Sequence, residues 1–445
     1  MKKEIKKQSE IFLFLILSVF VTMAGRAYGQ EDKPNIIYIL SDDQSWKDFG
    51  FMGHSHIETP HIDKLAEEGL TFTRGYVTAP LCSPSLASII TGLYPQQHGI
   101  TGNDPAFEFE GERYRSDWQL ARSRLYRNYL DEFQKHPTVP MLLKKLGYLS
   151  FQSGKWWGGH WKEGGFTHGM THGNPAKGGR HGDEGLKIGR EGMEPIFDFM
   201  DEAIEENKPF FIWYAPFLPH SPHNPPDSLL QKYLAKAPTK AVAAYWAMCE
   251  WLDITVGQLL DRVEEKGLTE NTLVVFVTDN GWIQDPDQPN RYVSGSKQDP
   301  QDMGIRTPII YKWPKRITPR MDTENLTSSI DMVTTTLAAV GMDPLPAMPG
   351  INVMDQKALE ERKMIFSLDF SHDMIHVDQP EKTLESRIVI STPWKMIVPD
   401  VANKENQETL LYNIIQDPTE RENLALNRPE VVQELMRELD NWWQR

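Results

Sequence analysis

Two long apolar runs in this chain each end in oxygen-bearing side chains. The runs and the residues that follow them are 35–40 with Asp42 and Asp43, and 272–278 with Asp279 and Asn280. Apolar runs without alternation predict strands buried on both faces, as in a parallel sheet. Ligands bind at the carboxyl ends of such strands, so we expect these side chains to meet. Three carboxylates would repel each other there without a cation, and an all-oxygen set favours Ca²⁺ or Mg²⁺ over Zn²⁺.

Two further predicted strands are also followed by side chains that can take part in catalysis or bind an anion. Residues 147–152 precede Lys155, and residues 210–214 precede His220. Strand-like runs alternate with helical stretches along the chain, which is the pattern of an α/β sheet. One polar strand ending is ordinary, but four together indicate a single site at one edge of one sheet.

A candidate nucleophile stands at the start of a predicted helix. Ser83 suits the N-cap, Pro84 the first helical position and Gly92 the end, so Cys82 directly precedes the helix. Helix N-termini attract anions and lower the pKa of a thiol. This position suits both an activated nucleophile and an anionic substrate, although a cysteine in such a place is more often structural.

The N-terminus has the layout of a secretory signal peptide, which we place at 1–29. Four lysines precede an apolar stretch at 11–23, and Ala27-Tyr28-Gly29 fits a cleavage site. An uncleaved membrane anchor is the alternative, but the apolar stretch is short for a full span. We therefore expect export to the periplasm or extracellular space, with no stable membrane insertion after cleavage. Export would permit a disulfide between the two cysteines, Cys82 and Cys249.

Composition and charge narrow the class of protein. The chain has 445 residues and a formal net charge of -15, which argues against nucleic acid as a partner. A Gly- and His-rich stretch at 158–192 predicts a long surface loop. A Pro-rich linker after residue 341 separates a main domain at 30–345 from a smaller α+β subdomain at 346–445. This second part holds predicted strands at 387–390 and 395–398 and a final helix at 429–443.

At this point the residues resemble the sulfatase family. The family hallmark is Cys-x-Pro-x-Arg followed by a helix that ends in Thr-Gly, and this chain has CSPSL at 82–86 and TG at 91–92. Further segments are similar to sequence segments of the family and occur in the same order along the chain. Together they span nearly the whole mature chain: 35–43, 58–76, 154–156, 219–220, 278–281, 304–308 and 411–424.

The resemblance implies an alkaline phosphatase-like fold, with a large and mostly parallel sheet between helices, and a metal-dependent sulfuric ester hydrolase. It implies that Cys82 is oxidised to formylglycine by a formylglycine-generating or anaerobic sulfatase-maturating enzyme, and that the hydrated aldehyde attacks the sulfate ester. By the same resemblance, Lys155 and Lys297 would bind sulfate oxygens and His220 would act as general acid. A calcium ion, with magnesium as the weaker alternative, would be held by residue 82 and four oxygen ligands: Asp42, Asp43, Asp279 and Asn280.

Two positions depart from the family pattern. Leu86 replaces the motif arginine, which in the family helps the modifying enzyme and stabilises the hydrated aldehyde. Trp157 stands where the family has a histidine after Gly-Lys-Trp. Four histidines of the Gly- and His-rich stretch are candidates to replace it: His160, His168, His172 and His181. All residues of the predicted metal site are therefore present, whereas two residues that assist the nucleophile in the family are replaced.

Three functions remain open on this sequence. The first is a divergent active sulfatase, which the intact metal set favours. The second is a phosphate or phosphonate ester hydrolase of the same fold that uses Cys82 unmodified. The third is a non-catalytic protein that binds sulfated glycans, which would explain Leu86. For the first, we expect a carbohydrate sulfate as substrate, because aromatic side chains stack on sugars and five tryptophans lie in segments expected near the pocket mouth: Trp156, Trp157, Trp161, Trp213 and Trp282.

Overall fold

The computed structural model describes residues 33–106, 116–173, 181–405 and 407–443. The predicted signal peptide at 1–29 falls outside these ranges and stays a prediction. Within them, no helix has both the length and the apolar character that a membrane crossing requires. The domain boundary at residue 345 likewise stays a prediction.

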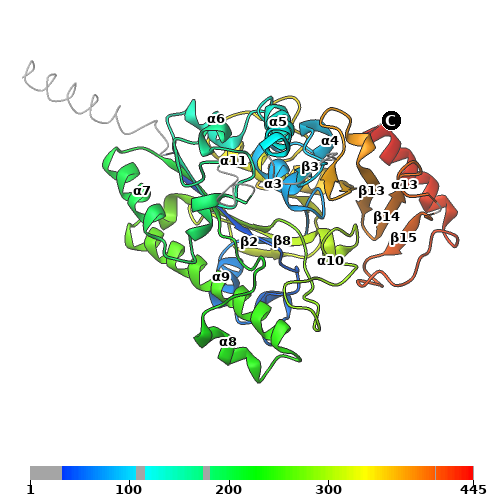
Figure 1. Cartoon of the computed structure of the whole chain (residues 1–445), viewed down its shortest axis with the longest axis horizontal. Coiled ribbons are helices and arrows are strands. Elements are labelled where there is room, and N and C mark those ends of the chain that lie inside the picture. Colours follow the sequence, from blue (N-terminus) through cyan, green and yellow to red (C-terminus); the bar gives the residue numbers. More distant parts are fainter. Residues whose placement is uncertain (1–32, 107–115, 174–180, 406, 444–445) are drawn as a thin grey trace, which may run out of the picture. The chain divides into compact units, whose positions relative to one another are not determined.

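A large mixed sheet forms the centre of the described part of the chain (Figure 1). Its strand order is β10 (Thr327–Ser328), β2 (Leu70–Tyr76), β8 (Arg306–Lys312), β7 (Thr272–Thr278), β1 (Asn35–Ser41), β6 (Phe210–Ala215), β4 (Leu149–Gly154) and β5 (His168–Gly169). A short strand, β9 (Arg320–Asp322), pairs with β2 outside this order. Strand β8 runs antiparallel to β2 and β7, and the other neighbouring pairs are parallel. The predicted mostly parallel sheet is confirmed.

The four strands singled out in the sequence are consecutive neighbours at the centre of this sheet. They follow each other in the order β7, β1, β6 and β4. Their ends are level, because Ser41 of β1 pairs with Thr278 of β7, and Gly154 of β4 pairs with Ala215 of β6. The side chains that follow these strands therefore emerge together at one edge.

Helices cover both faces of the sheet, as the unbroken apolar strands require. On one face, Tyr38 packs with residues of α3 (Cys82–Thr91), α5 (Ser116–Phe133), α6 (Val139–Lys144) and α11 (Asp331–Ala339). On the other, Ile37 packs with residues of α2 (Pro60–Glu67), α7 (Glu194–Glu205) and α9 (Lys240–Glu265). Alternate residues of β1 thus enter different cores, which is why the strand shows no polar face. Other described helices of this part of the chain are α4 (Pro95–His98), α8 (Asp227–Leu234), α10 (Asp302–Ile305) and α12 (Gln356–Glu361).

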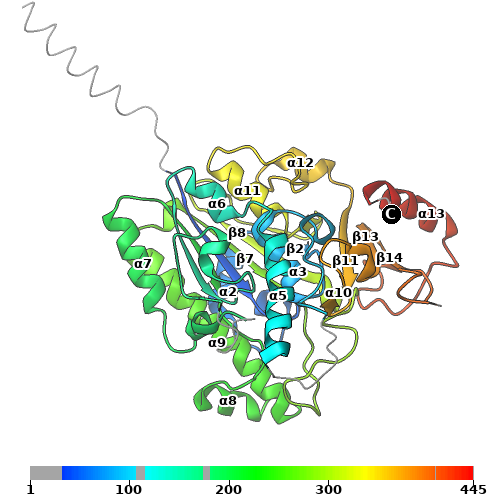
Figure 2. The same cartoon turned by 45° about the horizontal axis from the view of Figure 1, so that its top comes forward.

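A smaller antiparallel sheet follows toward the C-terminus (Figure 2). Its order is β11 (Ile365–Phe370), β13 (Leu384–Ser391), β14 (Trp394–Pro399) and β15 (Leu410–Asn413). The last helix, α13 (Pro429–Trp442), covers it, and Trp442 stacks on Phe366 with ring centroids 4.4 Å apart. A separate two-stranded sheet pairs β3 (Asp104–Pro105) with β12 (Asp373–Met374) in parallel. The predicted α+β character of the C-terminal part is confirmed.

Local details differ from expectation in two places. Helix α3 begins at Cys82 itself, with Leu81 at the N-cap, so the prediction of Ser83 as N-cap is wrong. The stretch 158–192 is not a plain loop, because its described residues contain β5 and two short 3₁₀ helices, Trp161–Gly164 and Asp183–Lys187.

Candidate active site

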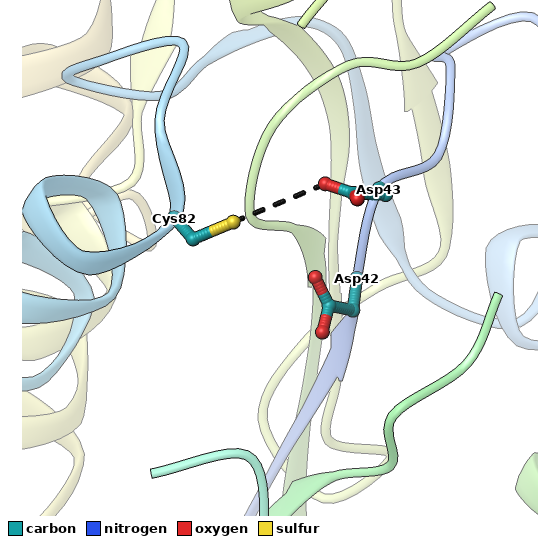
Figure 3. Close-up of side chains that lie close together, drawn as sticks. All are labelled: Asp42, Asp43 and Cys82. Atoms are coloured by element: carbon teal, nitrogen blue, oxygen red, sulfur yellow. Dashed lines mark hydrogen bonds between the residues drawn. The ribbon is translucent and has the colours of Figure 1, made fainter. Parts of the chain in front are cut away.

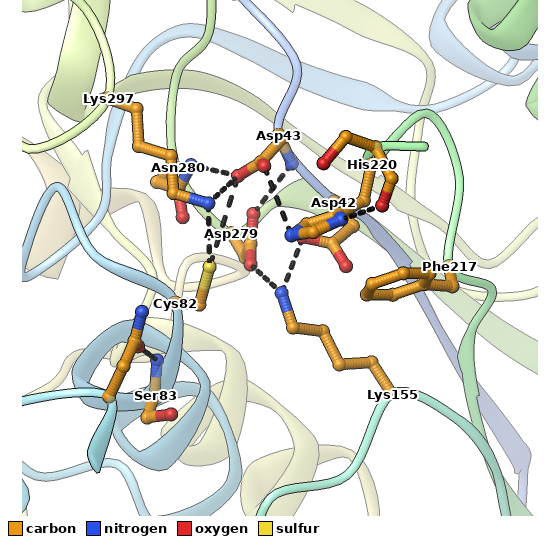
Figure 4. Close-up of polar contacts among 12 residues, drawn as sticks. Asp42, Asp43, Cys82, Ser83, Lys155, Phe217, His220, Asp279, Asn280 and Lys297 are labelled. Atoms are coloured by element: carbon orange, nitrogen blue, oxygen red, sulfur yellow. Dashed lines mark hydrogen bonds and ion pairs between the residues drawn. The ribbon is translucent and has the colours of Figure 1, made fainter. Parts of the chain in front are cut away.

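The ends of β1 and β7 are tied together by hydrogen bonds from backbone and side chains. Asp279 N donates to Ser41 O at 2.9 Å, and Asp43 N donates to Asp279 Oδ1 at 3.1 Å. Asn280 Nδ2 donates to Asp43 Oδ1 at 2.7 Å. These contacts hold Asp43 in a left-handed conformation, with φ of 63°, which is unusual for a residue other than glycine. The two oxygen-bearing pairs therefore form one cluster, as predicted (Figure 4).

Cys82 lies directly beside this cluster. One ligand atom each from Cys82, Asp42 and Asp43 lies within 4.8 Å of the others, and all three residues are buried (Figure 3). The thiol donates to Asp43 Oδ1 across 3.9 Å. The thiol belongs to helix α3, which lies on one side of the cluster, and β1 lies on the opposite side (Figure 3). Segments far apart in the sequence therefore meet at this cluster.

Two lysines complete the cluster, and both are buried. Lys155 follows Gly154 of β4, and its Nζ donates to Asp42 Oδ1 at 2.6 Å and to Asp279 Oδ2 at 3.4 Å. Lys297 Nζ donates to Asp43 Oδ1 at 2.5 Å and to Cys82 Sγ at 3.2 Å. The Lys297 ammonium group therefore lies between Asp43 and the sulfur, and the Lys155 ammonium group lies between Asp42 and Asp279 (Figure 4).

The donor set fits a hard divalent cation. Three oxygen atoms accept no hydrogen bond from the described residues although they are buried: Asp42 Oδ2, Asp43 Oδ2 and Asn280 Oδ1. Buried polar atoms normally have partners, so three orphans in one cluster indicate an unmet ligand. Three carboxylates and two ammonium groups also leave one negative charge, which a cation would reverse. All-oxygen coordination is the type that Ca²⁺ and Mg²⁺ take.

His220 faces the cluster from the loop after β6. Its Nδ1 lies 2.6 Å from Ser221 O, so Nδ1 carries the proton and donates it. Its Nε2 lies 3.4 Å from Asp43 Oδ2, and Phe217 stacks on the ring with centroids 4.1 Å apart. This arrangement fixes the ring and leaves Nε2 as the atom that can exchange a proton with a bound group.

Burial and charge set the protonation of the cluster. Burial raises the pKa of the Cys82 thiol to about 12, although Lys155 and Lys297 oppose this shift. The expectation of a lowered thiol pKa at the helix N-terminus is therefore wrong for this structure, because desolvation outweighs the helix and the lysines. Burial also disfavours the charged form of Asp43, but Lys297, His220 and Lys155 together outweigh it, and the pKa of this carboxyl lies below its usual range. Burial lowers the pKa of His220 well below its usual value.

The cluster forms the floor of a cavity of about 490 Å³. Asp43, Cys82, Lys155, His220 and Lys297 all line it. The described lining also includes residues that the sequence alone did not point to: Ser83, Asn103, Ser221, Asn290, Arg291, Tyr292, Gln298 and His372. Apart from Ser83, which lies in the first turn of α3 next to Cys82, they come from loops without a motif, so only the tertiary fold brings them together.

Comparisons with known proteins identify the family of this chain. The family model named Sulfatase matches residues 34–342, and a second, named N-sulphoglucosamine sulphohydrolase, C-terminal, matches residues 297–444. The chain belongs to the sulfatase family. Membership makes it a sulfuric ester hydrolase by family, and metal dependence is typical of that family.

Similar proteins act on sulfated sugars, according to their names. The chain is 29% identical to N-acetylgalactosamine-6-sulfatase of Canis lupus familiaris, over 77% of this chain and 71% of that protein. It is 25% identical to N-acetylgalactosamine-6-O-sulfatase of Bacteroides thetaiotaomicron, over 92% of this chain and 93% of that protein. The crystal structure of Ps i-CgsB in complex with k-i-k-neocarrahexaose has the same fold, with a TM-score of 0.72 and 23% identity over 92% of each chain.

The two departures from the sulfatase pattern have structural counterparts. Leu86 lies one helical turn after Cys82, is 1% exposed and belongs to the apolar core. Trp157 is buried against Phe133 and Trp156, with ring centroids 5.4 and 5.0 Å away. Both positions at which the family resemblance led us to expect polar groups are thus built into apolar packing here.

One of the four candidate histidines reaches the cavity. His181 lines it, with its ring centroid 5.6 Å from that of His220. His168 instead lies 3.2 Å from Glu202, and the rings of His160 and His172 contact each other. The sequence could name these histidines but not choose among them, because the choice depends on how the 158–192 stretch packs.

The expected row of tryptophans at the pocket mouth is only partly present. Trp157 and Trp282 line the cavity, and both are buried. Trp156 and Trp213 are 0% exposed and belong to the core, and Trp161 packs beside that core. Cys249 is also a core residue, and neither cysteine forms a disulfide, so the disulfide that export would permit is not formed.

Proposed function

We propose that this sulfatase hydrolyses a carbohydrate sulfate and that formylglycine derived from Cys82 is its nucleophile. One observation carries the proposal. Buried oxygens of Asp42, Asp43 and Asn280 that accept no hydrogen bond lie in the cluster beside Cys82, and two ammonium groups lie in the same cluster. Such a site binds a divalent cation and an anionic ester at the same place.

The residues divide the chemistry between them. Asp42, Asp43, Asp279 and Asn280, together with residue 82, would hold Ca²⁺, with Mg²⁺ as the weaker alternative. When bound, the cation would polarise a sulfate oxygen and orient the nucleophile. Lys297 Nζ is already 3.2 Å from the sulfur of Cys82, so it can contact a sulfate that approaches this side chain. Lys155 neutralises further sulfate charge from the other side.

Proton transfer falls to His220. A hydroxyl of the hydrated aldehyde attacks the sulfur atom of the ester and gives its proton to Nε2 of His220, an O–S bond forms, and the bond from sulfur to the sugar oxygen breaks. The leaving oxygen takes a proton, which Nε2 of His220 can give because Nδ1 is held by Ser221 O at 2.6 Å. Loss of a proton from the second hydroxyl then reforms the aldehyde and releases sulfate.

Leu86 supports a second candidate, a non-catalytic protein that binds sulfated glycans. A buried leucine one turn after Cys82 supplies neither a hydrogen bond to a hydrated aldehyde nor the arginine of the maturation motif. The same cluster of cations would still bind sulfate. The two candidates therefore differ in the chemical state of residue 82 and not in the shape of the site.

The test is mass spectrometry of the peptide that contains Cys82, from protein purified out of its native host, together with ion chromatography of sulfate released from sulfated monosaccharides. Exchange of the thiol for an aldehyde makes the peptide lighter, and we expect this lighter peptide and sulfate release. An intact thiol with tight glycan binding and no turnover would establish the second candidate. Turnover of a phosphate diester or phosphonate by the unmodified protein would instead identify the phosphate or phosphonate ester hydrolase.

The proposal also names a partner and a compartment. Conversion of Cys82 needs a formylglycine-generating or anaerobic sulfatase-maturating enzyme that accepts Leu86. The lysine-rich and apolar layout of residues 1–29 supports export to the periplasm or extracellular space, where sulfated polysaccharides are accessible.

A further inference from the structure

A segment from the C-terminal part of the chain forms part of the cavity wall. Strand β12 pairs with β3, Asn103 N donates to His372 O at 2.8 Å, and Ala106 N donates to Met374 O at 2.7 Å. The approach is close, because a Cβ at Gly102 would lie 2.5 Å from Met374 N. His372 and Asn103 both line the cavity that contains Cys82.

A chain of hydrogen bonds joins this wall to the nucleophile helix. Ser83 N, in the first turn of α3, donates to Asn103 Oδ1 at 2.9 Å. Asn103 Nδ2 lies 3.4 Å from His372 Nε2, and His372 Nδ1 lies 2.6 Å from Asp373 Oδ1. Asn103 is 7% exposed, whereas the His372 side chain is 44% exposed and reachable from solvent.

The donor and acceptor roles in this chain of hydrogen bonds follow from the groups at its two ends, the Ser83 N–H and the Asp373 carboxylate. The Ser83 N–H can only donate, so Asn103 Oδ1 accepts and Nδ2 points to His372. Asp373 is best served by a donor, so His372 Nδ1 carries the proton and Nε2 accepts. Asn103 Nδ2 keeps a second N–H, and the 3.4 Å bond to His372 Nε2 is long and easily replaced.

We propose that Asn103 and His372 form a recognition site for a sugar hydroxyl next to the scissile sulfate, with His372 as a specificity-determining residue. A hydroxyl both donates and accepts, and this pair offers one acceptor, Nε2, and one donor, the second amide N–H. A leaving group without hydroxyls cannot use the pair. This inference rests on the proposed function, because it names a group of the substrate, a sugar hydroxyl, that the same cavity would recognise.

The test compares two kinds of sulfate ester with the His372→Ala variant. The sugar probe is whichever of N-acetylgalactosamine-6-sulfate, N-acetylglucosamine-6-sulfate and galactose-4-sulfate the wild type cleaves fastest, and the second probe is p-nitrophenyl sulfate. We expect kcat/KM for the sugar to fall about tenfold, mostly through KM, as the loss of one or two hydrogen bonds predicts. For the aryl ester, which has no hydroxyl, we expect a change below about twofold.

Two control variants separate recognition from a structural role. His376→Ala removes an exposed histidine four residues away that does not line the cavity, and it should leave both substrates unaffected. His372→Gln keeps a side chain that can donate and accept, and it should recover part of the sugar rate. Equal losses for the sugar and the aryl ester in His372→Ala, with a lowered melting temperature, would show a structural role and overturn the inference.

The same measurements distinguish a failure of the proposed sulfate hydrolysis from a failure of the proposed sugar recognition. Wild-type protein that cleaves p-nitrophenyl sulfate but neither cleaves nor binds the three sugars overturns the inference and leaves sulfate hydrolysis standing. Wild-type protein that cleaves no sulfate ester contradicts the proposed hydrolysis. In that case isothermal titration with N-acetylgalactosamine-6-sulfate decides, and the inference requires a loss of affinity of about tenfold in His372→Ala. Equal dissociation constants, or no binding to the wild type, would overturn it.

Discussion

The chemistry of the site depends on how three carboxylates share one small buried volume. Asp42, Asp43 and Asp279 are each 3% exposed or less, so their charges are poorly screened by water. Lys155 and Lys297 offset part of this charge by direct contact. The meeting of these carboxylates could be predicted from the sequence because strand ends converge, and Lys155 could be placed for the same reason because it follows β4. The position of Lys297 could not be predicted from the strands, because it lies in a loop.

Calcium binding is the first prediction at this scale. We expect one Ca²⁺ per chain by elemental mass spectrometry, and a higher melting temperature with Ca²⁺ than after chelation, because binding at a hundredfold excess over Kd adds about 2.7 kcal/mol. Asp42→Ala should abolish both effects. The exposed Asp287→Ala is the matched control and should keep both. Stoichiometric Ca²⁺ in Asp42→Ala would contradict the ligand set.

Asp253 gives a prediction about pH. It is 0% exposed and accepts backbone N–H groups of His61 and Ile62, yet burial raises its pKa from 3.8 to about 7. Since the folded pKa is raised, its contribution to stability is full below about pH 4 and is lost as the pH rises to about 7. Asp253→Asn cannot ionise. We therefore expect its melting temperature, relative to wild type, to improve steadily over this range and then level off.

The control for this prediction is Asp227→Asn, an exposed change of the same kind, which should show a difference from wild type that is nearly constant with pH. A constant difference for Asp253→Asn as well, measured by calorimetry at closely spaced pH values, would mean that Asp253 is ionised throughout. In that case its hydrogen bonds at the start of α2 would outweigh desolvation.

At the scale of elements, the ends of the strands could be predicted because local patterns determine them. Apolar runs predicted β1, β6 and β7, and a run of mixed polarity predicted β4; their order in the sheet then placed the site. Helix α3 was expected too, but its first turn was not, because a favourable N-cap residue at Ser83 is outweighed by the contact of Ser83 N with Asn103 Oδ1. Tertiary contacts override a local capping preference here.

Gly154 is the element-scale position most sensitive to change. It ends β4 with φ of 77°, and a Cβ there would lie 1.8 Å from Ala215 O of β6. Gly154→Ala must therefore push β4 away from β6 directly before Lys155. We expect kcat/KM to fall at least about tenfold, since misplacement of a catalytic group by an ångström costs that much or more, together with a lower melting temperature.

Gly147→Ala is the matched control for this backbone effect. Gly147 also has a positive φ, of 87°, but a Cβ there meets no atom within 4 Å. Its variant should lose only about 1–2 kcal/mol, the cost of a left-handed residue, and keep full kcat/KM. Similar kinetic losses in both variants would show that the conformation alone matters and not the contact with β6.

At the scale of the whole molecule, a buried ion cluster joins the C-terminal sheet to the main sheet. Lys395 of β14 is 0% exposed, and its Nζ lies 3.0 Å from Asp302 Oδ1 and 2.7 Å from Glu420 Oε1. Asp302 begins the short helix α10, just before β8. Removal of the lysine would leave Glu420 buried without this counter-charge, and it would leave Asp302 with only Arg306, whose Nη1 lies 3.5 Å from Asp302 Oδ2.

Lys395→Met should therefore destabilise the protein by about 3–5 kcal/mol, the usual cost of breaking a buried pair from one side. Lys404→Met is the comparison, because Lys404 pairs with Glu385 at a site that is 31% and 25% exposed and should contribute about 1 kcal/mol or less. Thermal unfolding of both variants measures the difference. Equal losses of stability would contradict this prediction, because they would mean that the buried carboxylates around Lys395 do not remain as unpaired charges in the variant.

The contribution of the C-terminal part to the cavity could not be predicted from the sequence. His372 and Asn103 are separated by most of the chain, and neither belongs to a recognisable motif. Their contact depends on the parallel pairing of β3 with β12, two strands of two residues each. Such short strands have no periodicity, so only the folded arrangement of the larger elements brings them together.

The burial of Cys82 sets an order of events during biosynthesis. The residue is 4% exposed, and the wall beside its helix is closed by a segment beyond residue 371. An enzyme that oxidises this cysteine needs direct access to its Cβ and sulfur. The proposed conversion must therefore precede docking of the segment beyond residue 371, while the newly made chain is still extended. A protein that folds first would keep its thiol permanently, whatever maturation enzymes its cell contains.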